Sequence, residues 1–399
     1  MIKVINMLNK QKIKYELETI GNICDTITDY VAAGSFKDLA DHVKYLSEPD
    51  YGLLVRTKDI KNDFKDEKLI YINEDAFNYL WRVNLNKDSL ILPNIGNCGE
   101  VHYIDCKKLP YNNCALGPNA ILVRSNTCNL KYLYYVLQTP FFQDQLMKIT
   151  SPVGQRKFNK TDLKKLLVPV PSVEDQERIV DYLEKFEEMI KLKEDELSKR
   201  KQQYNYISNK LLINDKYSSD KIESLFNISK GKTPIQKSIP GEYPLVVTTS
   251  ERKSSNDYQF DSKAVCIPLV SSRGHGIASL NHVYYQEGKF ALGNILCALE
   301  SKNEDIISAK YLYYYFESTK NYTLVPLMKG GANVSLHMND ILSINIKYPS
   351  LEKQNTIIQK LDALIEYDSI LSREIELRRK QYEYYRNKLL SFEELSVSE

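Results

Sequence analysis

The chain has 399 residues, of which 43 % are hydrophobic and 27 % charged, which is an ordinary composition for a globular protein with room for two or three domains. No apolar run approaches the roughly 20 residues that a membrane-spanning helix needs, and the first residues lack the apolar stretch of a secretory signal, so we expect a cytoplasmic protein. The formal net charge of +2 neither indicates nor excludes nucleic-acid binding, because binding requires only a local basic face.

Residues 1–170 form the first predicted globular region. Short β-rich runs at 52–56 and 68–72 alternate with polar turns, and residues 130–137 favour a helix. A polar, glycine-containing loop follows at 151–158. After it, Asp162 is expected to open a short apolar strand that ends at Pro171.

Residues 171–213 are predicted to form a long helix. Pro171 is tolerated just before a helix, and Ser172 is a candidate N-cap. Apolar residues recur at alternating spacings of three and four, which is typical of a coiled-coil seam, and Lys193 and Arg200 fill the two skipped positions. The seam residues are Ile179, Leu183, Phe186, Ile190, Leu197, Tyr204, Ile207 and Leu211.

Residues 217–348 form a second predicted globular region, with a β-rich run at 264–270, a helical segment at 309–316 and a glycine-containing loop at 329–336. Asp340 then takes the place of Asp162 before a strand. Residues 349–391 repeat the long helix, displaced by 178 residues from the first copy, with Asp368 at one skipped seam position. Its seam residues are Ile357, Leu361, Leu364, Leu371, Ile375, Tyr382 and Leu389.

The repeat is selective. The phrase Lys-Tyr-Leu-Tyr-Tyr occurs at 131–135 and again at 310–314, whereas residues 25–110 and 230–290 are hard to align with each other. A period of this length indicates a whole duplicated module rather than a short solenoid unit. The sequence therefore predicts a common frame that carries two different surfaces.

The two helical seams differ in a reciprocal way. Ile190 in the first copy corresponds to Asp368 in the second, and Lys193 corresponds to Leu371. We therefore expect the helices to pair antiparallel, with Asp368 offsetting Lys193 or Arg200, because an unpaired buried charge is costly. The alternative is that each helix packs only on its own globular region.

In both copies an apolar strand is followed by Pro-Ser, an acidic residue, Gln, Ile, and a heptad helix that ends in Asn-Lys-Leu-Leu. This pattern resembles the specificity (S) subunit of type I restriction-modification systems. The phrases at 17–23 and 222–228 resemble the start of that family's target recognition domains, and 229–234 fits the family better than 24–28 does.

The resemblance implies an α+β fold class: two mixed α/β target recognition domains separated by two long helices that form an antiparallel coiled coil. It also implies a non-catalytic DNA reader whose domains each bind one half of a bipartite site, while the helices set the spacer. Expected partners are double-stranded DNA, two methyltransferase (M) subunits that carry S-adenosylmethionine, and restriction motor-nuclease (R) subunits. No cofactor in this chain and no membrane are expected.

Catalytic motifs are weak in this sequence. No Asn/Asp-Pro-Pro-Tyr/Phe motif occurs, and the Gly231-Lys-Thr segment lacks the first glycine of a phosphate-binding loop. Asp50 followed by Asp66 and Lys68 fits a nuclease metal pattern only by chance. The seven cysteines contain no C-x-x-C pair and are expected to be free thiols, and the five histidines show no metal-ligand spacing.

Candidate DNA contacts are chosen by residue type and place. Arg273 lies in a glycine-flanked loop from which it can reach guanine, although a solvated turn is the alternative. Segments 155–157 and 329–333 occupy matching places in the repeats, which favours shared contacts to the DNA backbone. The candidates are Arg56, Lys58, Asn94, Asn97, Gln155, Arg156, Lys157, Lys230, Lys232, Thr248, Thr249, Arg252, Lys253, Ser271, Ser272, Arg273, His275, Lys329 and Asn333.

A different class of protein also fits the repeat. A duplicated coiled-coil adaptor would join two protein partners and would not read DNA directly. Binding to duplex DNA, with its dependence on salt concentration, separates the adaptor from the reader.

Overall fold

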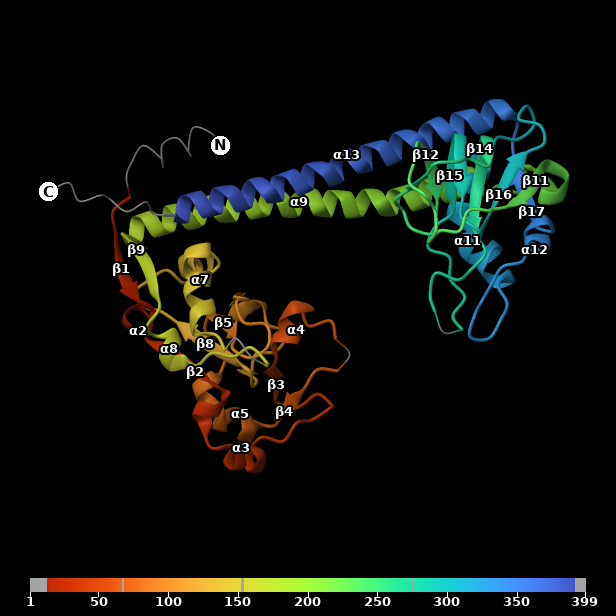
Figure 1. Ribbon diagram of the computed structural model, residues 1–399. Helices are drawn as coiled ribbons and strands as arrows, with labels where there is room; N and C mark the ends of the chain where they lie inside the picture. Colours follow the sequence, from red (N-terminus) through yellow and green to blue (C-terminus); the bar gives the residue numbers. More distant parts are fainter. Residues whose placement is uncertain (1–12, 67, 152–153, 275, 392–399) are drawn as a thin grey trace. The chain divides into compact units, whose positions relative to one another are not determined.

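The computed structural model describes residues 13–66, 68–151, 154–274 and 276–391. The chain forms two compact units (Figure 1). Unit 1 comprises Met1–Lys191 and Glu376–Glu399, and unit 2 comprises Leu192–Ile375. Each unit contains one mixed α/β part and portions of both long helices.

Unit 1 is built on a four-stranded sheet of order β2-β8-β5-β6, with a three-stranded sheet of order β4-β3-β7 and a separate β1-β9 ribbon. Strands β5 and β8 are nearly continuous apolar runs and are buried along almost their whole length, as central strands are. The strands are β1 (Tyr15–Thr19), β2 (Thr26–Asp29), β3 (Gly52–Val55), β4 (Tyr71–Ile72), β5 (Ser89–Pro93), β6 (His102–Ile104), β7 (Cys114–Leu116), β8 (Ala120–Arg124) and β9 (Leu167–Pro171).

Short helices connect these strands. They are α2 (Ile20–Ile23), η1 (Tyr30–Ala33), α3 (Phe36–His42), α4 (Thr57–Lys61), α5 (Glu74–Tyr79), η2 (Trp81–Val83), η3 (Cys106–Lys108), α6 (Leu130–Val136), α7 (Pro140–Ile149) and α8 (Lys160–Leu163). The segment expected to be a strand from Asp162 onward begins instead as helix α8. The reason is local: the Asn159 side chain accepts a hydrogen bond from the Asp162 N–H at 2.8 Å and caps a helical turn.

Unit 2 contains one six-stranded sheet of order β11-β16-β14-β15-β12-β13 and a β10-β17 ribbon. Its strands are β10 (Ser218–Lys221), β11 (Phe226–Lys230), β12 (Tyr243–Val246), β13 (Lys253–Ser255), β14 (Phe260–Pro268), β15 (Tyr284–Leu292), β16 (Leu296–Ser301) and β17 (Asn345–Tyr348). Its short helices are α10 (Ile222–Leu225), α11 (Ala309–Thr323), η4 (Val325–Leu327) and α12 (Met338–Leu342). Asp340 lies in α12, so the expected strand start at this residue is also wrong.

The two globular parts share one strand topology, including the segments whose sequences do not align. Strands β2-β8-β5 pair as β11-β16-β14 do, β3 pairs with β4 and β7 as β12 pairs with β13 and β15, and β6 and β7 together take the place of β15. The Gly117 N–H donates to the Val55 carbonyl at 2.8 Å, and the Gly293 N–H donates to the Val246 carbonyl at 3.0 Å. The duplication therefore extends, in strand topology, through the segments whose sequences do not align.

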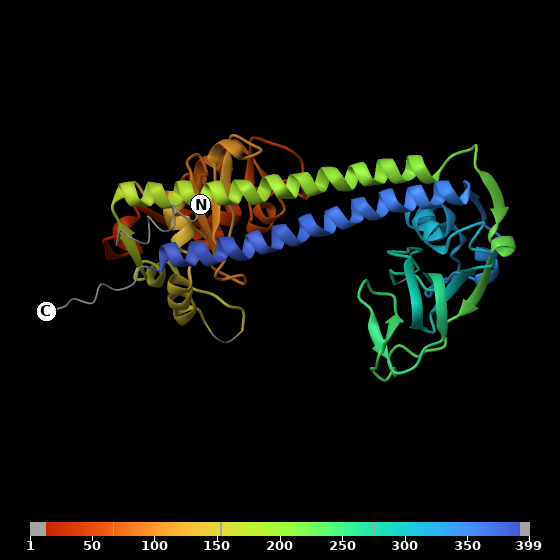
Figure 2. The same ribbon diagram turned by 90° about the horizontal axis from the view of Figure 1, so that it is seen from above.

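The long helices are α9 (Val173–Leu212) and α13 (Leu351–Leu390). In unit 1 the ring centroids of Phe186 and Tyr382 lie 5.8 Å apart. In unit 2 the Arg200 Nε lies 3.0 Å from the Asp368 Oδ1. Within unit 2, Lys193 pairs with Glu374 and Arg200 with Asp368, so positions advance along α9 as they recede along α13 and the helices are antiparallel. The two helices run side by side in Figures 1 and 2. The predicted fold class is confirmed.

The seam positions lie on the inner faces of these helices. Ile179 and Leu183 are fully buried in unit 1, as is Leu361 in unit 2, and none of the predicted seam residues is exposed. At the skipped positions, Arg200 pairs with Asp368 and the Lys193 Nζ lies 3.2 Å from a Glu374 carboxylate oxygen. The charges inside the seam are therefore offset across it.

Each long helix packs on a globular part in addition to pairing with the other long helix. Buried Gln176 and Gln354 hold their helix starts by donating to the carbonyls of Pro171 and Pro349, both at 2.9 Å. Their Oε1 atoms accept from the N–H groups at the entrances to α6 and α11 at 2.8 and 3.0 Å. The Gln that follows the repeated Pro-Ser thus joins the start of each long helix to its globular part by hydrogen bonds.

The repeated Lys-Tyr-Leu-Tyr-Tyr phrase also joins each long helix to its globular part. Lys131 pairs with Glu184, and Lys310 lies 2.7 Å from Asp362. The hydroxyls of Tyr132 and Tyr311 donate to strand carbonyls at 2.8 and 3.1 Å. The helical prediction for both phrases is confirmed.

All seven cysteines are free thiols, as predicted from their spacing. Among the residues that the structure describes, no helix is both long enough and apolar enough to cross a bilayer.

Candidate nucleic-acid interface

The predicted DNA contacts of unit 2 gather at one end of its sheet. The strand register sets Lys230, the last residue of β11, opposite Cys297, and sets Pro268, the last residue of β14, opposite Leu296. The Gly293 N–H, in the turn just before β16, donates to the carbonyl of Val246, the last residue of β12, at 3.0 Å. The segments that follow β11, β12 and β14 therefore all leave the sheet at the end where β16 begins.

In both units the loop after the central strand is joined to a second, distant loop by the same backbone hydrogen bonds. In unit 1 the Phe158 N–H donates to the Asn94 carbonyl at 3.1 Å, and the Gly96 N–H donates to the Arg156 carbonyl at 2.8 Å. The Ser151 N–H also donates to the Lys157 carbonyl at 3.0 Å. We call residues 94–99 with 151 and 154–158 the unit 1 paired loops.

Unit 2 repeats these three backbone hydrogen bonds. The Leu336 N–H donates to the Leu269 carbonyl at 2.9 Å, the Ser271 N–H to the Val334 carbonyl at 3.0 Å, and the Lys329 N–H to the Ser335 carbonyl at 2.8 Å. We call residues 269–274 and 276–281 with 329–336 the unit 2 paired loops. A rigid platform with fixed backbone and variable side chains is what a reader of different sequences requires.

The side chains displayed on the two platforms differ. The unit 1 paired loops expose Asn97, Gln155, Arg156 and Lys157. The unit 2 paired loops expose Ser272, Arg273, Lys329 and Asn333, while Ser271 is half-buried and its Oγ donates to the Ile277 carbonyl at 2.5 Å. His275 lies outside the described residues. The structure thus brings together the two groups of predicted contacts that are far apart in each half of the sequence.

Arg273 and Lys329 differ in whether their side chains have a polar partner within the described structure. The Arg273 side chain has no polar partner among the described residues, and its loop is positioned by a hydrogen bond from its own N–H to the Ser271 Oγ at 3.2 Å. The Lys329 Nζ lies 3.2 Å from Asp340. An unpaired, exposed guanidinium on a hydrogen-bonded loop suits bidentate recognition of a base edge.

Further cations lie beside the unit 2 platform. Gln259 bridges the segment after β11, because its Oε1 accepts from the Lys232 N–H at 2.9 Å and its Nε2 donates to the Lys230 carbonyl at 2.8 Å. Both lysine side chains are consequently held outward and are exposed. Thr248, Thr249 and Lys253 are also exposed, at the end of β12 and the start of β13.

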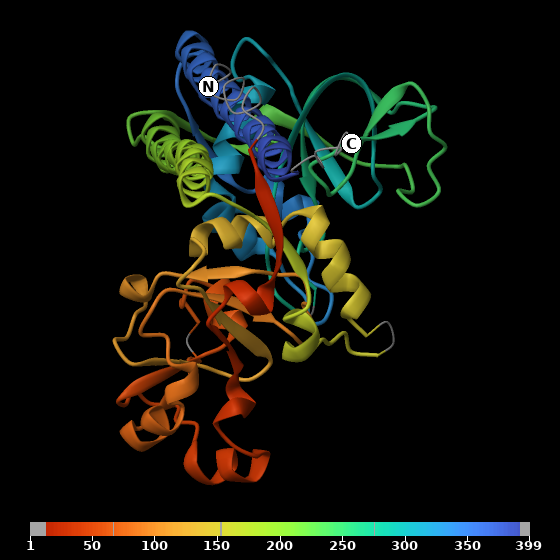
Figure 3. The same cartoon turned by 90° about the vertical axis from the view of Figure 1, so that its left-hand side faces the viewer.

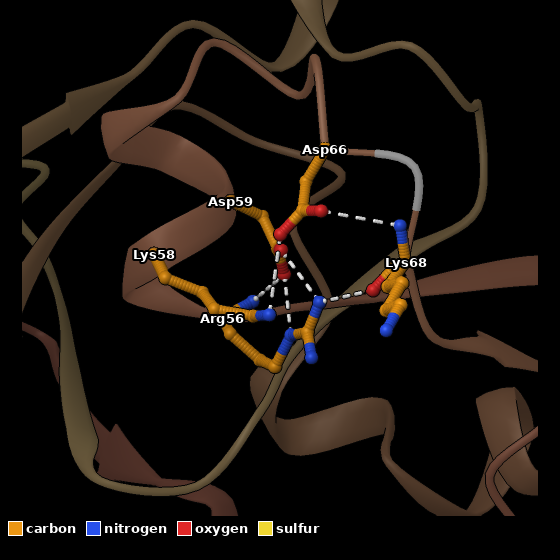
Figure 4. A network of polar contacts seen from close by, with 5 residues as sticks. All are labelled: Arg56, Lys58, Asp59, Asp66 and Lys68. Atoms are coloured by element: carbon orange, nitrogen blue, oxygen red, sulfur yellow. Dashed lines mark hydrogen bonds and ion pairs between the residues drawn. The ribbon is translucent and has the colours of Figure 1, made fainter. Parts of the chain in front are cut away.

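Two predicted arginine contacts are largely engaged within the protein. In Figure 4 the Arg56 guanidinium lies against Asp59: its Nε and Nη2 each donate to that carboxylate at 2.7 Å, and Nη2 donates again to the Lys68 carbonyl. Asp59 is fully buried, and Lys58 pairs instead with Asp66 at 3.2 Å. These contacts favour a structural role for Arg56.

Arg252 is held in a comparable way in unit 2. Its Nε donates to the Gln286 Oε1 at 3.1 Å, its Nη2 donates to the Tyr285 carbonyl, and its guanidinium lies 5.0 Å from the centre of the Tyr284 ring. Asn94 is similarly committed, since its Nδ2 donates to the Phe158 carbonyl at 3.2 Å. These contacts favour a structural role for Arg252, while in Asn94 only the Nδ2 is engaged and the Oδ1 accepts no hydrogen bond from the described residues.

One group of possible metal ligands occurs among the described residues. Oxygen and sulfur atoms of Asp88, Asp105 and Cys106 lie within 4.8 Å of one another. Asp88 already accepts hydrogen bonds from the Tyr103 hydroxyl and from the Cys106 N–H, at 2.5 and 3.0 Å. Burial and the neighbouring carboxylates raise the pKa of the Cys106 thiol, which disfavours the thiolate that a metal needs. Internal hydrogen bonding therefore accounts for this group.

The sequence contains one repeated motif that indicates the shared strand topology and that the comparison of the helices and the Lys-Tyr-Leu-Tyr-Tyr phrases did not reveal. Ala115-Leu-Gly117 and Ala291-Leu-Gly293 are the same tripeptide at the same place in the two sheets, displaced by 176 residues. Ser151 and Lys329, and likewise Lys157 and Ser335, fill equivalent backbone positions with unlike side chains. The backbone partners were not predicted, because backbone hydrogen bonds leave little trace in residue type.

Comparison with known proteins agrees with this architecture. The model of the type I restriction modification DNA specificity domain family matches residues 12–201 and 214–378. The specificity subunit of the EcoR124I/EcoR124II type I restriction enzyme of Escherichia coli is 29 % identical over 303 residues, covering 67 % of this chain and 72 % of the relative. A putative type I specificity subunit of Mycoplasma pneumoniae is 26 % identical over 320 residues, covering 74 % of this chain and 81 % of the relative.

Two solved structures share the fold. The crystal structure of a type I restriction-modification S subunit from M. genitalium has a TM-score of 0.54 and 16 % sequence identity, covering 95 % of this chain and 97 % of that one. A chain from a study of the assembly and conformational transition of a type I restriction-modification system has a TM-score of 0.62 and 13 % identity, covering 96 % and 99 %.

The duplicated platform and the antiparallel helices define a two-headed scaffold protein. With the family model matching both halves, the chain belongs to the type I restriction-modification DNA specificity family.

Proposed function

We propose that this chain is the non-catalytic DNA-binding subunit of a type I restriction-modification complex. Unit 1 reads one half of a bipartite DNA sequence, unit 2 reads the other half, and helices α9 and α13 set the spacer between the halves. The shared family supports the general role, and the paired loops support the assignment of the reading surface.

One observation carries this assignment: three equivalent backbone hydrogen bonds join the paired loops in both units, while the displayed side chains differ. Asn97, Gln155 and Arg156 are exposed in unit 1, where unit 2 exposes Ser272, Arg273 and Asn333. The fold alone does not require that the same three backbone bonds join two exposed loops in both units. Two unlike heads on one scaffold correspond to an asymmetric site with two different half-sequences.

The long helices are proposed to dock two methyltransferase subunits. Each unit carries large apolar side chains that lie outside the seam and face solvent: Leu377 and Tyr384 in unit 1 are 55 % and 59 % exposed, and Leu192 and Ile370 in unit 2 are 63 % and 60 % exposed. Apolar residues spaced by seven, as Leu377 and Tyr384 are, suit a partner helix. One such face in each unit corresponds to two partner subunits.

The chemistry is assigned to those partners. S-adenosylmethionine is expected on each methyltransferase subunit, and motor-nuclease subunits are expected to join the same complex. The proposal is that this chain supplies sequence recognition and positioning only.

The first experiment is a gel shift of the chain co-expressed with its methyltransferase on duplex DNA, at several salt concentrations. Specific retention with a steep dependence of affinity on salt is the expected result. Equal retention of DNA with and without this chain would favour the adaptor. Magnesium-dependent cleavage by the chain alone would instead indicate a nuclease.

The second experiment maps methylated positions in the host genome by single-molecule sequencing, before and after residues 217–348 are replaced by those of a relative. Only one half of the methylated sequence is expected to change. A change in both halves would contradict the assignment of one half-site to each unit.

A further inference from the structure

Unit 1 contains a cavity of about 590 Å³, which is within the range of pockets that hold small organic groups. Its base includes the buried residues Leu39 and Val43, and its rim includes Phe36 and Tyr45, which are 80 % and 50 % exposed. An aromatic residue exposed to this degree, beside an open cavity, makes few of the contacts that normally hold such side chains. The cavity is therefore suited to a flat apolar group that would lie against these rings.

The cavity lies at the reading end of the unit. Asn94 and Ile95, which line it, belong to the unit 1 paired loops. Pro118 and Asn119, which also line it, form the turn before β8, and the Asn119 carbonyl accepts a hydrogen bond from the Asn94 N–H at 3.1 Å. Helix α3, which supplies Phe36, lies at the end of unit 1 that points away from α9 and α13 in Figures 1 and 3. A group that enters the cavity would thus come from the same side as DNA bound to the paired loops.

The polar groups at the cavity suit a ligand that has hydrogen-bond donors at its edge. The Oδ1 atom of Asn94 is buried and accepts no hydrogen bond within the described structure. Asp29, also at the cavity, is neutralised by the Lys160 Nζ at 2.8 Å and accepts from the Ala32 N–H at 3.1 Å. The cavity therefore combines an unused acceptor with no unpaired charge, and exposed Arg156 and Lys157 stand on the adjoining loop.

Unit 2 closes the equivalent space. The register shows that Lys230 takes the place of Asp29. After Lys230 the chain runs directly along the turn at Gly293, where the Thr233 N–H donates to the Leu292 carbonyl at 3.1 Å and Thr233 accepts from the Asn294 N–H at 2.9 Å. A Cβ on Gly231 would lie 2.1 Å from the Gly293 carbonyl oxygen, so this packing needs glycine. In unit 1 the chain leaves as η1 and α3 instead, and the cavity lies beneath them.

We propose that this cavity receives one nucleobase that leaves the stack of the duplex read by unit 1. The base would lie against Phe36 and Tyr45, and an N–H group at its edge would donate to the Asn94 Oδ1. The inference rests on the proposed function, and it adds that the two units read DNA in different ways: unit 1 by extruding a base, and unit 2 by contacts to bases that remain stacked.

The exposed aromatic rings and the nearby cations favour a nucleobase over other occupants of the cavity. Stacking of bases on aromatic side chains is favourable and tolerates any base, and cations beside the site can hold the flanking phosphates. A base that leaves the duplex loses its pairing and stacking, and this loss is smallest where the base is already mismatched. Binding should therefore become tighter when the extruded base is mispaired.

The test measures the affinity of the full complex for duplexes that carry one mismatch at each position of the unit 1 half-site in turn. For the wild type we expect a mismatch at one position to tighten binding by about tenfold or more, and mismatches in the unit 2 half-site to weaken it. Ala40→Phe, which fills the cavity from an exposed position of α3, should remove this preference for the mismatch. Ala40→Ser leaves the cavity open and should keep it.

Three results separate the possibilities. If no mismatch in the unit 1 half-site tightens binding while the matched site is still bound specifically, the cavity proposal is wrong and the proposed function stands. If Ala40→Phe keeps the full preference, the extruded base enters the methyltransferase or another site, and the proposal is equally wrong. If the wild type shows no specific binding to the matched site, the proposed function itself is contradicted.

A second variant guards against misfolding of Ala40→Phe. Phe36→Ser removes the most exposed wall of the cavity at little risk to the fold, because the side chain is 80 % exposed. It should reduce the mismatch preference at least threefold and leave the affinity for the unit 2 half-site unchanged. An unchanged preference in Phe36→Ser would overturn the stacking role.

Discussion

Arg200 of α9 and Asp368 of α13 meet inside the helical seam, with the Arg200 Nε 3.0 Å from the Asp368 Oδ1. The Arg200 guanidinium also lies 3.8 Å from the centre of the Tyr367 ring. The two ionic side chains are only 25 % and 18 % exposed, so solvent screens their attraction less than it screens a surface pair. The pair thus stabilises the antiparallel alignment of the helices in unit 2.

A double-mutant cycle should measure this pair directly. We expect Arg200→Ala and Asp368→Ala to show a coupling of about 1–2 kcal/mol in the free energy of unfolding, obtained from urea denaturation. The control pair Asp181 and Lys185, on the exposed face of α9, is 64 % and 71 % exposed. Its coupling should be about 0.3–0.5 kcal/mol. Equal couplings for the two pairs would show that the seam pair has no special role.

Gln354 should be among the positions of unit 2 at which a substitution lowers stability most. Gln354→Leu removes the side-chain partner of three backbone groups: the part-buried Ser308 N–H and Ile306 carbonyl, and the buried Pro349 carbonyl. We expect a loss of about 3 kcal/mol in unfolding free energy, measured by urea denaturation. Gln359→Leu, at an exposed position of the same helix, should change stability by less than about 0.5 kcal/mol.

Arg56 should behave as a structural residue. Arg56→Ala leaves the carboxylate of Asp59, which is fully buried, without its bidentate partner, and breaking such a pair costs about 3 kcal/mol. Lys58→Ala removes only a more exposed ion pair and should cost less than about 1 kcal/mol. Thermal unfolding of both variants gives the comparison. Full stability of Arg56→Ala, combined with weaker DNA binding, would restore Arg56 as a DNA contact.

Unit 1 should lose stability in mild acid through His102. Burial lowers the pKa of this imidazole, and Glu100, whose carboxylate lies 3.2 Å from its Nε2, opposes the shift. Because the folded pKa lies below the unfolded value of about 6.5, the unfolded state binds the proton first. The contribution of His102 to the free energy of unfolding is therefore fully present above about pH 6.5. It is lost as the pH falls through the pKa of His102 in the folded state.

The measurement is unfolding free energy against pH for the wild type and His102→Gln. Subtracting the two curves isolates the histidine from the carboxylates, and the difference should grow as the pH falls below about 6.5. His337→Gln, at an exposed position before α12, serves as the matched control. A flat difference curve for His102→Gln would contradict the prediction.

Arg273 and Lys232 should differ in what they contribute to DNA binding. Arg273→Ala should cost about 1–3 kcal/mol and relax the sequence preference in the unit 2 half-site only. Lys232→Ala should weaken binding to all sequences about equally and reduce the salt slope by about one. Competition binding with half-site variants at several salt concentrations measures both. A uniform loss for Arg273→Ala would assign it to phosphate.

The sequence determined the long helices and their pairing. The spacing of Ile179, Leu183 and Phe186 specifies a buried seam, because side chains three and four residues apart share one helix face. The charges at Arg200 and Asp368 predicted the antiparallel arrangement, since each needs a partner of opposite sign. Local spacing and complementary charge are properties that a sequence displays directly.

Only the tertiary structure decided how the reading surface is built. The paired loops depend on backbone bonds between Gly96 and Arg156, and between Ser271 and Val334, whose residue types carry no common pattern. The bidentate contact of Arg56 with buried Asp59, which favours a structural role for the arginine, is likewise visible only in the folded structure. Residues distant in sequence meet here through sheet topology, and topology is fixed by the packing of the whole unit rather than by any local stretch of residues.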